Sequence, residues 1–179
     1  MRSLRQIVPR SAPSLLSALA LAAITSAVSC AHDPFDGRVF HAGRIAFQTG
    51  PIPATWERLS IEGPLLAFKD HDSLGSIDVY GRCGKDRDDV PLEALTNHLL
   101  IGFTEREIDP QLKLEMDGRE ALHSTLRAKL DGVRMSLDIF VLKKDGCVYD
   151  LVYVAYPDRY ARGVQGFEAF VSGFATVEG

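Results

Sequence analysis

Three side chains could bring metal or thiol chemistry together in this sequence: Cys83, His98 and Cys147. A zinc site is one interpretation, but the chain has no Cys-x-x-Cys and no His-x-x-x-His pair, the usual spacings of structural zinc sites. A disulfide between the two cysteines is the second interpretation, and two buried thiols are the third. We favour the disulfide, which would close a loop of about 64 residues and stabilise the fold by roughly 4 kcal/mol.

Enzyme motifs are missing from the sequence. It contains no Gly-x-Ser-x-Gly, no phosphate-binding glycine loop and no paired-carboxylate signature. The acids of residues 86–89 lack the spacing of an EF-hand loop, so we interpret them as a solvated charged loop. A catalytic cysteine must be accessible and electropositive, whereas Cys83 and Cys147 fall on apolar faces of their segments. We therefore expect a protein that is not an enzyme and needs no metal and no cofactor.

The elements that position these side chains are clearest in the C-terminal half. Asp-Gly pairs at 117–118, 131–132 and 145–146 recur every 14 residues, and Asp-Gly between alternating runs is a strong hairpin signal. Three such turns predict an antiparallel meander of four strands. A two-residue loop at the second turn pairs apolar with apolar residues: Leu130 with Val133, Ala128 with Met135, and Leu126 with Leu137.

At the other two turns, the number of loop residues decides which apolar side chains share a face of the sheet. Apolar residues before and after the first turn are both even-numbered, so a three-residue loop with Gly118 in the left-handed region would keep them on one face. We predict that loop. If the third turn has the same form, Tyr149, Leu151 and Tyr153 share a face with Val141, and Asp150 points to the opposite layer.

The rest of the chain predicts further strands and two helices. Strands are expected at 43–47, 55–61, 65–70 and 75–83 because these segments are short, apolar and bounded by turns. A leucine stripe predicts a helix within 88–103, with Pro91 in its first turn and Gly102 at its end. A last helix begins at Pro157-Asp158, with Asp158 as its cap. Its buried stripe comprises Val164, Phe167, Phe170, Val171 and Phe174.

This order predicts an α+β fold, an antiparallel β-sheet with a four-strand C-terminal meander packed against a middle helix and a C-terminal helix. The segments "PLEALTNHLLIGF" and "VYDLVYVAYPDRYARGVQGFEAFVSGF" resemble those of the PsbP-like family, over about residues 38–176. That family includes a photosystem II extrinsic subunit, a Ran-binding nuclear factor and bacterial lipoproteins. The resemblance implies a non-catalytic binding module and transfers no site residues, because the family has no shared catalytic motif.

The N-terminus reads as an export signal. Arg2, Arg5 and Arg10 precede residues 11–29, which carry no charge and end in small residues. Its apolar part, Leu15 to Val28, is too short for a comfortable membrane span, and the stretch is mostly Ala, Ser and Leu. We interpret residues 1–29 as a secretory signal peptide; a buried first helix is the alternative.

Residues 27–30, "AVSC", resemble the lipobox of bacterial lipoproteins, except that Ala27 stands where Leu is commoner. The resemblance implies cleavage before Cys30, lipidation of Cys30 and membrane anchoring. A plain signal peptide cut nearby is the alternative. Residues 30–37 would then be a lipidated tether and residues 38–179 a single domain. In that family, Ala31 after the anchor favours the outer membrane, facing the periplasm.

The net charge of residues 30–179 restricts the classes of partner that the protein could bind. Loss of residues 1–29 removes three arginines and no acid, which leaves 17 Lys+Arg against 24 Asp+Glu, a formal charge of −7. An acidic domain lacks the basic footprint that nucleic-acid binding needs, so we expect no nucleic acid. We expect a membrane-anchored envelope lipoprotein that binds another envelope protein as a non-catalytic accessory or assembly factor. The alternative is a periplasmic small-molecule or lipid carrier with a pocket between sheet and helix.

Two segments have more apolar or aromatic residues than a core stripe needs. One is residues 97–103, "NHLLIGF", and the other is the tyrosine-rich stretch from 149 to 160. Tyrosine suits interfaces because it offers apolar area with a polar tip. The alternative for both is ordinary packing. The candidate partner-binding residues are His98, Leu100, Ile101, Phe103, Tyr156 and Tyr160.

Overall fold

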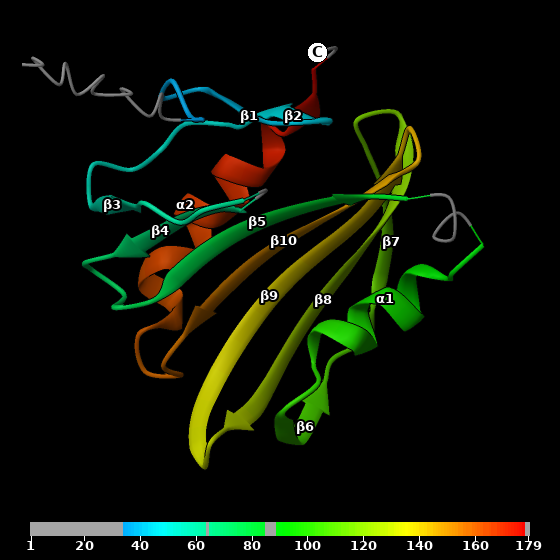
Figure 1. Cartoon of the computed structure of the whole chain (residues 1–179). Coiled ribbons are helices and arrows are strands. Elements are labelled where there is room, and N and C mark those ends of the chain that lie inside the picture. Colours follow the sequence, from blue (N-terminus) through cyan, green and yellow to red (C-terminus); the bar gives the residue numbers. More distant parts are fainter. Residues whose placement is uncertain (1–33, 64, 85–88, 178–179) are drawn as a thin grey trace, which may run out of the picture. The chain divides into compact units, whose positions relative to one another are not determined.

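The structure is a computed structural model that describes residues 34–63, 65–84 and 89–177 (Figure 1). The chain divides into two units, Met1–His32 and Asp33–Gly179, and the described residues belong to the second. The predicted signal peptide and Cys30 therefore lie outside the described residues. No helix within the described ranges has the length and apolar content needed to cross a membrane.

The larger sheet of the described part has eight strands, all paired antiparallel, in the order β3-β4-β5-β10-β9-β8-β6, with β7 also paired to β8. The strands are β3 (Trp56–Leu59), β4 (Leu65–Asp70), β5 (Ser76–Cys83), β6 (Phe103–Ile108), β7 (Leu112–Met116), β8 (Arg119–Leu130), β9 (Val133–Lys144) and β10 (Cys147–Ala155). The predicted meander is present as β7 to β10. Its first strand is short, because the chain ahead of it forms the separate strand β6 on the same edge of β8.

All three Asp-Gly turns have two residues, and both residues of each turn lie in the left-handed region. The φ angles are 51° and 72° at Asp117-Gly118, 49° and 82° at Asp131-Gly132, and 53° and 71° at Asp145-Gly146. The register predicted for the second turn is confirmed. The three-residue loop predicted for the first turn is wrong, since Met116 pairs directly with Arg119. The third turn also has two residues, since Lys144 pairs with Cys147.

The prediction of turn length from even- and odd-numbered apolar residues failed because both faces of the sheet are covered. Strand β8 buries Ala121 on one face and Leu122 on the other, so an apolar neighbour is accommodated on either side. Met116 therefore shares a face with Ala121 rather than with Leu122. For the same reason Tyr149, Leu151 and Tyr153 lie on the face of Phe140 and Leu142, while Asp150 lies opposite Val141 on the other face.

Helix α1 (Leu92–Leu99) and helix α2 (Tyr160–Ser172) pack on opposite faces of this sheet (Figure 1). Helix α1 buries Leu92 and Leu95 against the odd-numbered residues of β9. It lies within the predicted segment 88–103, and Leu100 is its C-cap. Pro91 is its N-cap and not, as predicted, a residue of its first turn. Gly102 follows with φ 94°, which ends the helix and turns the chain into β6.

Helix α2 begins later than predicted. Its N-cap is Arg159, and no side chain caps it, so the prediction of Asp158 as the cap is wrong. The Tyr156 carbonyl accepts hydrogen bonds from the N–H groups of Arg159 and Tyr160, which closes a turn ahead of the helix. The predicted apolar stripe is confirmed, because Phe167, Phe170, Val171 and Phe174 are buried and Val164 packs at their edge.

A small three-stranded sheet closes the domain over the same face as α2. It comprises β1 (Val39–Ala42), β2 (Ile45–Gln48) and β11 (Ala175–Thr176), in the order β1-β2-β11. Phe47 of β2 packs against Phe174 and Tyr149. The last strand therefore ties the end of the described chain to its beginning.

Candidate partner-binding surface

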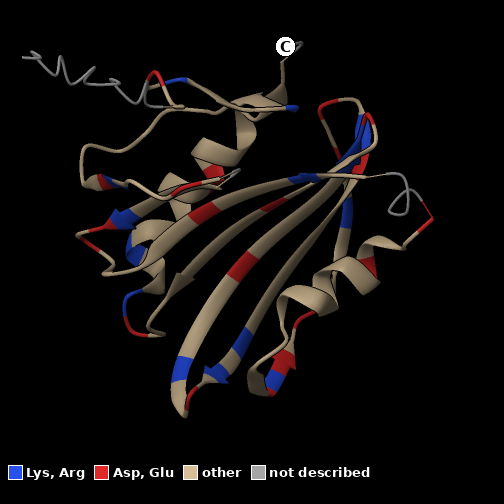
Figure 2. Ribbon diagram, in the orientation of Figure 1, with Lys and Arg blue, Asp and Glu red and all other residues tan. Residues whose placement is uncertain are grey.

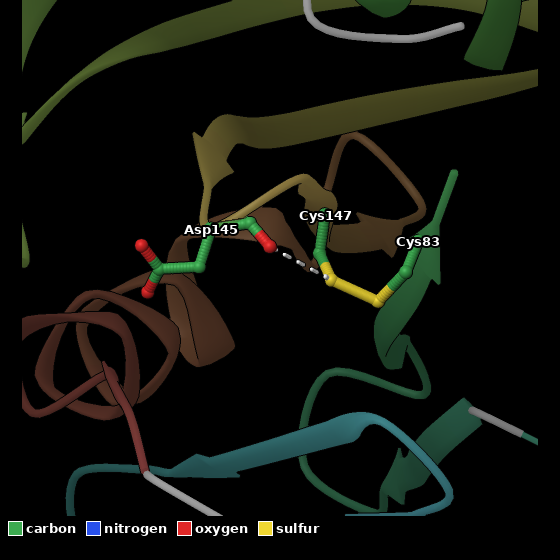
Figure 3. Close-up of a disulfide and its surroundings, with 3 residues drawn as sticks. All are labelled: Cys83, Asp145 and Cys147. Atoms are coloured by element: carbon green, nitrogen blue, oxygen red, sulfur yellow. Dashed lines mark hydrogen bonds between the residues drawn. A yellow bond between two sulfur atoms is a disulfide. The ribbon is translucent and has the colours of Figure 1, made fainter. Parts of the chain in front are cut away.

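Cys83 and Cys147 form a disulfide (Figure 3). They are directly opposite each other in the β5–β10 pair, with their Cα atoms 3.9 Å apart. The Cys147 sulfur also lies 3.8 Å from the Asp145 carbonyl oxygen, a contact without a proton because a disulfide sulfur carries none. In the disulfide, neither sulfur is a free thiol that could act as a nucleophile or as a thiolate ligand of zinc.

His98 does not join the cysteines. It lies exposed in the last turn of α1. Across the described residues, no group of three His, Cys, Asp or Glu side chains is placed to hold a metal ion.

A buried polar network under the start of α2 was not found from the sequence. The Asp138 carboxylate is 1% exposed and accepts hydrogen bonds from His123 Nε2 at 2.6 Å and the Tyr160 hydroxyl at 3.0 Å. Burial and the neighbouring Asp138 carboxylate raise the pKa of Tyr160 far above its ordinary value, so its hydroxyl stays a donor. Tyr160 thus fastens α2 to the sheet, and we assign it a packing role rather than a role on the surface.

Three further candidate residues, Leu100, Ile101 and Phe103, lie in or beside the segment that connects α1 to β6. Leu100 is 1% exposed and belongs to the core under α1. Ile101 is 69% exposed, and Phe103 is half-buried at the start of β6. Arg106 donates from Nε to the Phe103 carbonyl at 2.9 Å and from Nη2 to the Leu100 carbonyl. These bonds hold the connection in one shape, so Ile101 is presented by a supported backbone.

The strand register brings two more apolar residues beside Phe103. Phe103 lies opposite Leu130, and Leu130 lies opposite Val133, so the three residues form one row across β6, β8 and β9. Leu130 and Val133 are 39% and 47% exposed. We define the hairpin-tip surface as Ile101, Phe103, Leu130 and Val133. The sequence analysis missed Leu130 and Val133, although it had paired them with each other.

The opposite face of the same tip is charged rather than apolar. Lys129 contacts Glu105 at 2.6 Å and Arg127 contacts Glu107 at 3.3 Å. Figure 2 shows basic segments at the free ends of β8 and β9 and both signs of charge on β6. The hydrogen bond from Lys129 lowers the pKa of Glu105, which lies in a bulge at φ 47°. The tip is therefore apolar on the α1 side and ionic on the α2 side.

Tyr156 is 43% exposed just after β10. The register of β10 with β9 ends one residue earlier, at Ala155 opposite Ser136, so it does not place Tyr156 opposite the hairpin-tip surface.

A cleft of about 270 Å³ lies between β7 and α2. Its apolar lining includes Leu114, Met116, Phe140, Val171 and Phe174. Pockets for small molecules usually measure about 300–1,000 Å³ and enclose most of the ligand. This cleft is smaller and open to solvent, so it does not resemble the enclosed pocket between sheet and helix that a carrier needs.

Comparison with known proteins rests on structure, since no family model and no curated protein matches the sequence. Cyanobacterial PsbP (CyanoP) from Synechocystis sp. PCC 6803 superposes with a TM-score of 0.53 at 13% identity, over 84% of this chain and 99% of CyanoP. The domain has a PsbP-like fold.

Two further proteins share this PsbP-like architecture. LpqN of Mycobacterium tuberculosis superposes with a TM-score of 0.54 at 12% identity, over 77% of this chain and 88% of LpqN. The Ran-binding protein Mog1p of Saccharomyces cerevisiae gives 0.55 at 14% identity, over 76% of this chain and 92% of Mog1p. The chain spans only half the length of another match, from Bacteroides thetaiotaomicron. At these identities the likeness establishes the fold alone.

Proposed function

We propose that this protein is a lipid-anchored envelope protein whose PsbP-like domain binds another envelope protein, as a non-catalytic accessory or assembly factor. The observation that carries the proposal is the hairpin-tip surface, where Phe103, Leu130 and Val133 form one apolar row across three strands. The exposed Ile101 lies two residues before Phe103 in the connection that Arg106 supports. Apolar side chains grouped on a rigid surface are typical of protein interfaces, because burying them on a partner releases water without ordering the backbone.

The fold neighbours support this proposal by analogy. LpqN is described as involved in cell envelope biogenesis, and Mog1p is described as a Ran-binding protein. An analogy of fold does not transfer a partner, so the partner of this chain is identified only as a protein with a complementary apolar site.

The anchor part of the proposal rests on the sequence. Residues 11–29 have the uncharged, small-residue character of a signal peptide, and Cys30 closes a lipobox-like stretch. Two or three acyl chains on Cys30 would hold the domain stably at a membrane, whereas one would hold it only marginally. Ala31 favours the outer membrane, with the domain facing the periplasm.

The anchor is tested by mass. The full chain is expressed in its own cells, extracted from membranes with a mild detergent and measured by native mass spectrometry. We expect each copy of the chain to have the mass of residues 30–179 plus acyl chains, and we expect the Cys30→Ser variant to leave the membrane fraction. A wild-type mass without acyl chains contradicts the anchor. Fractionation mainly to the inner membrane contradicts the outer-membrane assignment.

The binding surface is tested by charge placed on it. Ile101→Asp should abolish co-purification of a stoichiometric subunit that is a different protein from this chain, because a buried unpaired carboxylate is costly at an interface. Ile61→Asp is the matched control, since Ile61 is 40% exposed and lies outside the hairpin-tip surface. Loss of the subunit in both variants, or in neither, would rule out this surface. A wild-type protein that carries a small bound molecule and no subunit would favour the carrier instead.

A further inference from the structure

Strand β7 has a free edge. Within the described residues it pairs with β8 on one side, and no described strand pairs with its other side. Exposed edges are usually shortened, covered or blocked, because their unpaired N–H and C=O groups bind other strands. Strand β7 contains no proline, so each of its residues keeps the backbone N–H that a paired strand needs.

The first Asp-Gly turn determines which residues of β7 face this edge. In a two-residue hairpin the residues flanking the loop, here Met116 and Arg119, form a hydrogen-bonded pair. Alternate residues then follow, so Leu112, Leu114 and Met116 direct their backbone groups toward β8. Lys113 and Glu115 direct their N–H and C=O groups outward. Two residues, and four backbone groups, are therefore available for pairing.

The side chains of β7 form a nearly palindromic pattern, in which apolar and charged residues alternate about Leu114. Leu112, Leu114 and Met116 lie on the α2 face, and Lys113 and Glu115 lie on the α1 face. Leu112 is 59% exposed, so its side chain is free to pack against a second strand. In an antiparallel self-pairing such a sequence sets apolar against apolar and a base against an acid.

We propose that two copies of this chain associate by antiparallel pairing of β7, with the two-fold axis passing beside Leu114. Leu114 then faces the partner's Leu114, Leu112 faces the partner's Met116, and Lys113 faces the partner's Glu115. The outward backbone groups meet one another in this register, because Lys113 and the partner's Glu115 form a hydrogen-bonded pair. An interface of this kind is isologous and closes at two subunits.

Neighbouring registers are less favourable. A two-fold axis at Lys113 would place Lys113 opposite the partner's Lys113, and an axis at Glu115 would place Glu115 opposite the partner's Glu115. Like charges directly opposite each other destabilise a strand pair. Lys113 is suited to the pairing because it is already charged and oriented. Its ammonium contacts Glu120 at 3.0 Å and Glu93 at 3.6 Å, and the hydrogen bond to Glu120 is the main cause of its raised pKa.

The dimer also accounts for the cleft between β7 and α2. Leu114 and Met116 form the β7 side of that cleft, and Phe140, Val171 and Phe174 form much of the rest. The partner's Leu112, opposite Met116, comes to the mouth of the cleft. One exposed leucine and one open apolar cleft in each copy are thereby covered together.

Cysteine substitution along β7 tests the proposal, because a two-fold axis brings only one residue of the strand to its own copy. The full chain is produced in its own cells with Leu114→Cys, and with Lys113→Cys and Glu115→Cys as matched controls. Residues of a non-hydrogen-bonded pair have Cα atoms about 4.5 Å apart, within the reach of a disulfide. We expect a covalent dimer on a non-reducing gel for Leu114→Cys and monomer for both controls.

Equal cross-linking at all three positions would overturn the register, and no cross-linking at Leu114→Cys would overturn the dimer. Sedimentation equilibrium then measures the mass of proteins that carry no new cysteine. This second measurement tests the dimer even if the Leu114→Cys variant does not fold. The wild type should have twice the monomer mass, and Glu115→Pro should be monomeric because it removes an outward N–H but no bond to β8. Glu115→Ala keeps that N–H and should remain largely dimeric. A monomeric wild type contradicts the proposal.

Discussion

Gly163 lies where α2 packs closely on the sheet and on the β4–β5 turn. A Cβ atom at this position would be 2.4 Å from the Tyr153 hydroxyl, 2.8 Å from Asp70 Oδ2 and 2.9 Å from Ser73 Oγ. These atoms belong to a buried polar group in which the Ser73 hydroxyl donates to Asp70 and the Tyr153 hydroxyl donates to the Tyr160 carbonyl. Glycine weakens a helix in isolation, so its presence here reflects the space that tertiary packing leaves.

Gly163→Ala should therefore destabilise the protein, although alanine is the better helix former. Overpacking typically costs about 1–3 kcal/mol, which outweighs the gain in helix propensity of about 1 kcal/mol. Urea denaturation measures the free energy of unfolding. Gly166→Ala is the control, since the atom nearest to its Cβ is Pro53 Cγ at 3.0 Å and Trp56 follows only at 3.7 Å. If Gly163→Ala proves as stable as Gly166→Ala, the packing argument is wrong.

Asp117 combines a turn with a tertiary contact. It holds a left-handed φ of 51°, and its carboxylate accepts hydrogen bonds from the Thr176 N–H and hydroxyl and contacts Lys144 at 2.8 Å. Burial alone would raise the pKa of Asp117, but the bonds from Lys144 and Thr176 outweigh burial and leave the pKa below its ordinary value. The ionised form therefore stabilises the folded state.

Asp117→Asn tests this linkage with little effect on the turn, because asparagine also tolerates the left-handed region. The wild type should be more stable than the variant at neutral pH. The difference should be complete above the ordinary pKa of 3.8 and should vanish as the pH falls through the lowered pKa of the folded protein. Urea denaturation across an acid pH series measures it. A difference that does not change with pH would show that the ion pair has no part in it.

At the scale of elements, the disulfide joins β5 to β10, two strands that are neighbours in the sheet but separated by 64 residues in sequence. Between these cysteines the chain forms α1, β6, β7, β8 and β9. The bond therefore restricts the unfolded chain over most of the meander, while the pairing of β5 with β10 brings the two cysteines together without further ordering.

Replacing both cysteines by alanine should lower the free energy of unfolding by roughly 4 kcal/mol in the chain-entropy model. Urea denaturation of the oxidised wild type and of the double variant gives the difference. A reducing agent should bring the wild type to the level of the variant and leave the variant unchanged. A loss below about 1 kcal/mol would contradict the entropic account.

At the scale of the whole domain, the two ends of the described chain close one core. Strand β11 pairs with β2, and Phe174 just before β11 is 4% exposed between Phe47 and Tyr149. The end of the chain therefore contributes to the same core as the first strands, and we expect the domain to unfold as one cooperative unit.

Phe174→Ala should cost about 3–5 kcal/mol, because it leaves a cavity among packed aromatic rings. Val177→Ala is the control, since Val177 is 37% exposed and its loss should change stability by less than about 0.5 kcal/mol. Thermal unfolding of both variants makes the comparison. A Phe174→Ala protein as stable as the control would mean that the end of the chain is dispensable for the core.

Much of the fold could be predicted locally. Three Asp-Gly pairs established the meander, since the left-handed turn they favour depends on two residues only. The apolar stripes located α1 and α2, although their ends moved by several residues. The disulfide and the candidates Ile101 and Phe103 also came from residue types and spacing alone.

Only the tertiary structure decided the faces and the sites. Alternation along a strand shows which residues share a face, but both faces of this sheet are buried, so it could not place Tyr149 or Met116 on the correct one. The row formed by Phe103, Leu130 and Val133 depends on the register of three strands. The network around Asp138 likewise joins β8, β9 and α2. Sequence determined the elements because local backbone preferences act between neighbours, whereas sites arise from contacts between residues far apart in the chain.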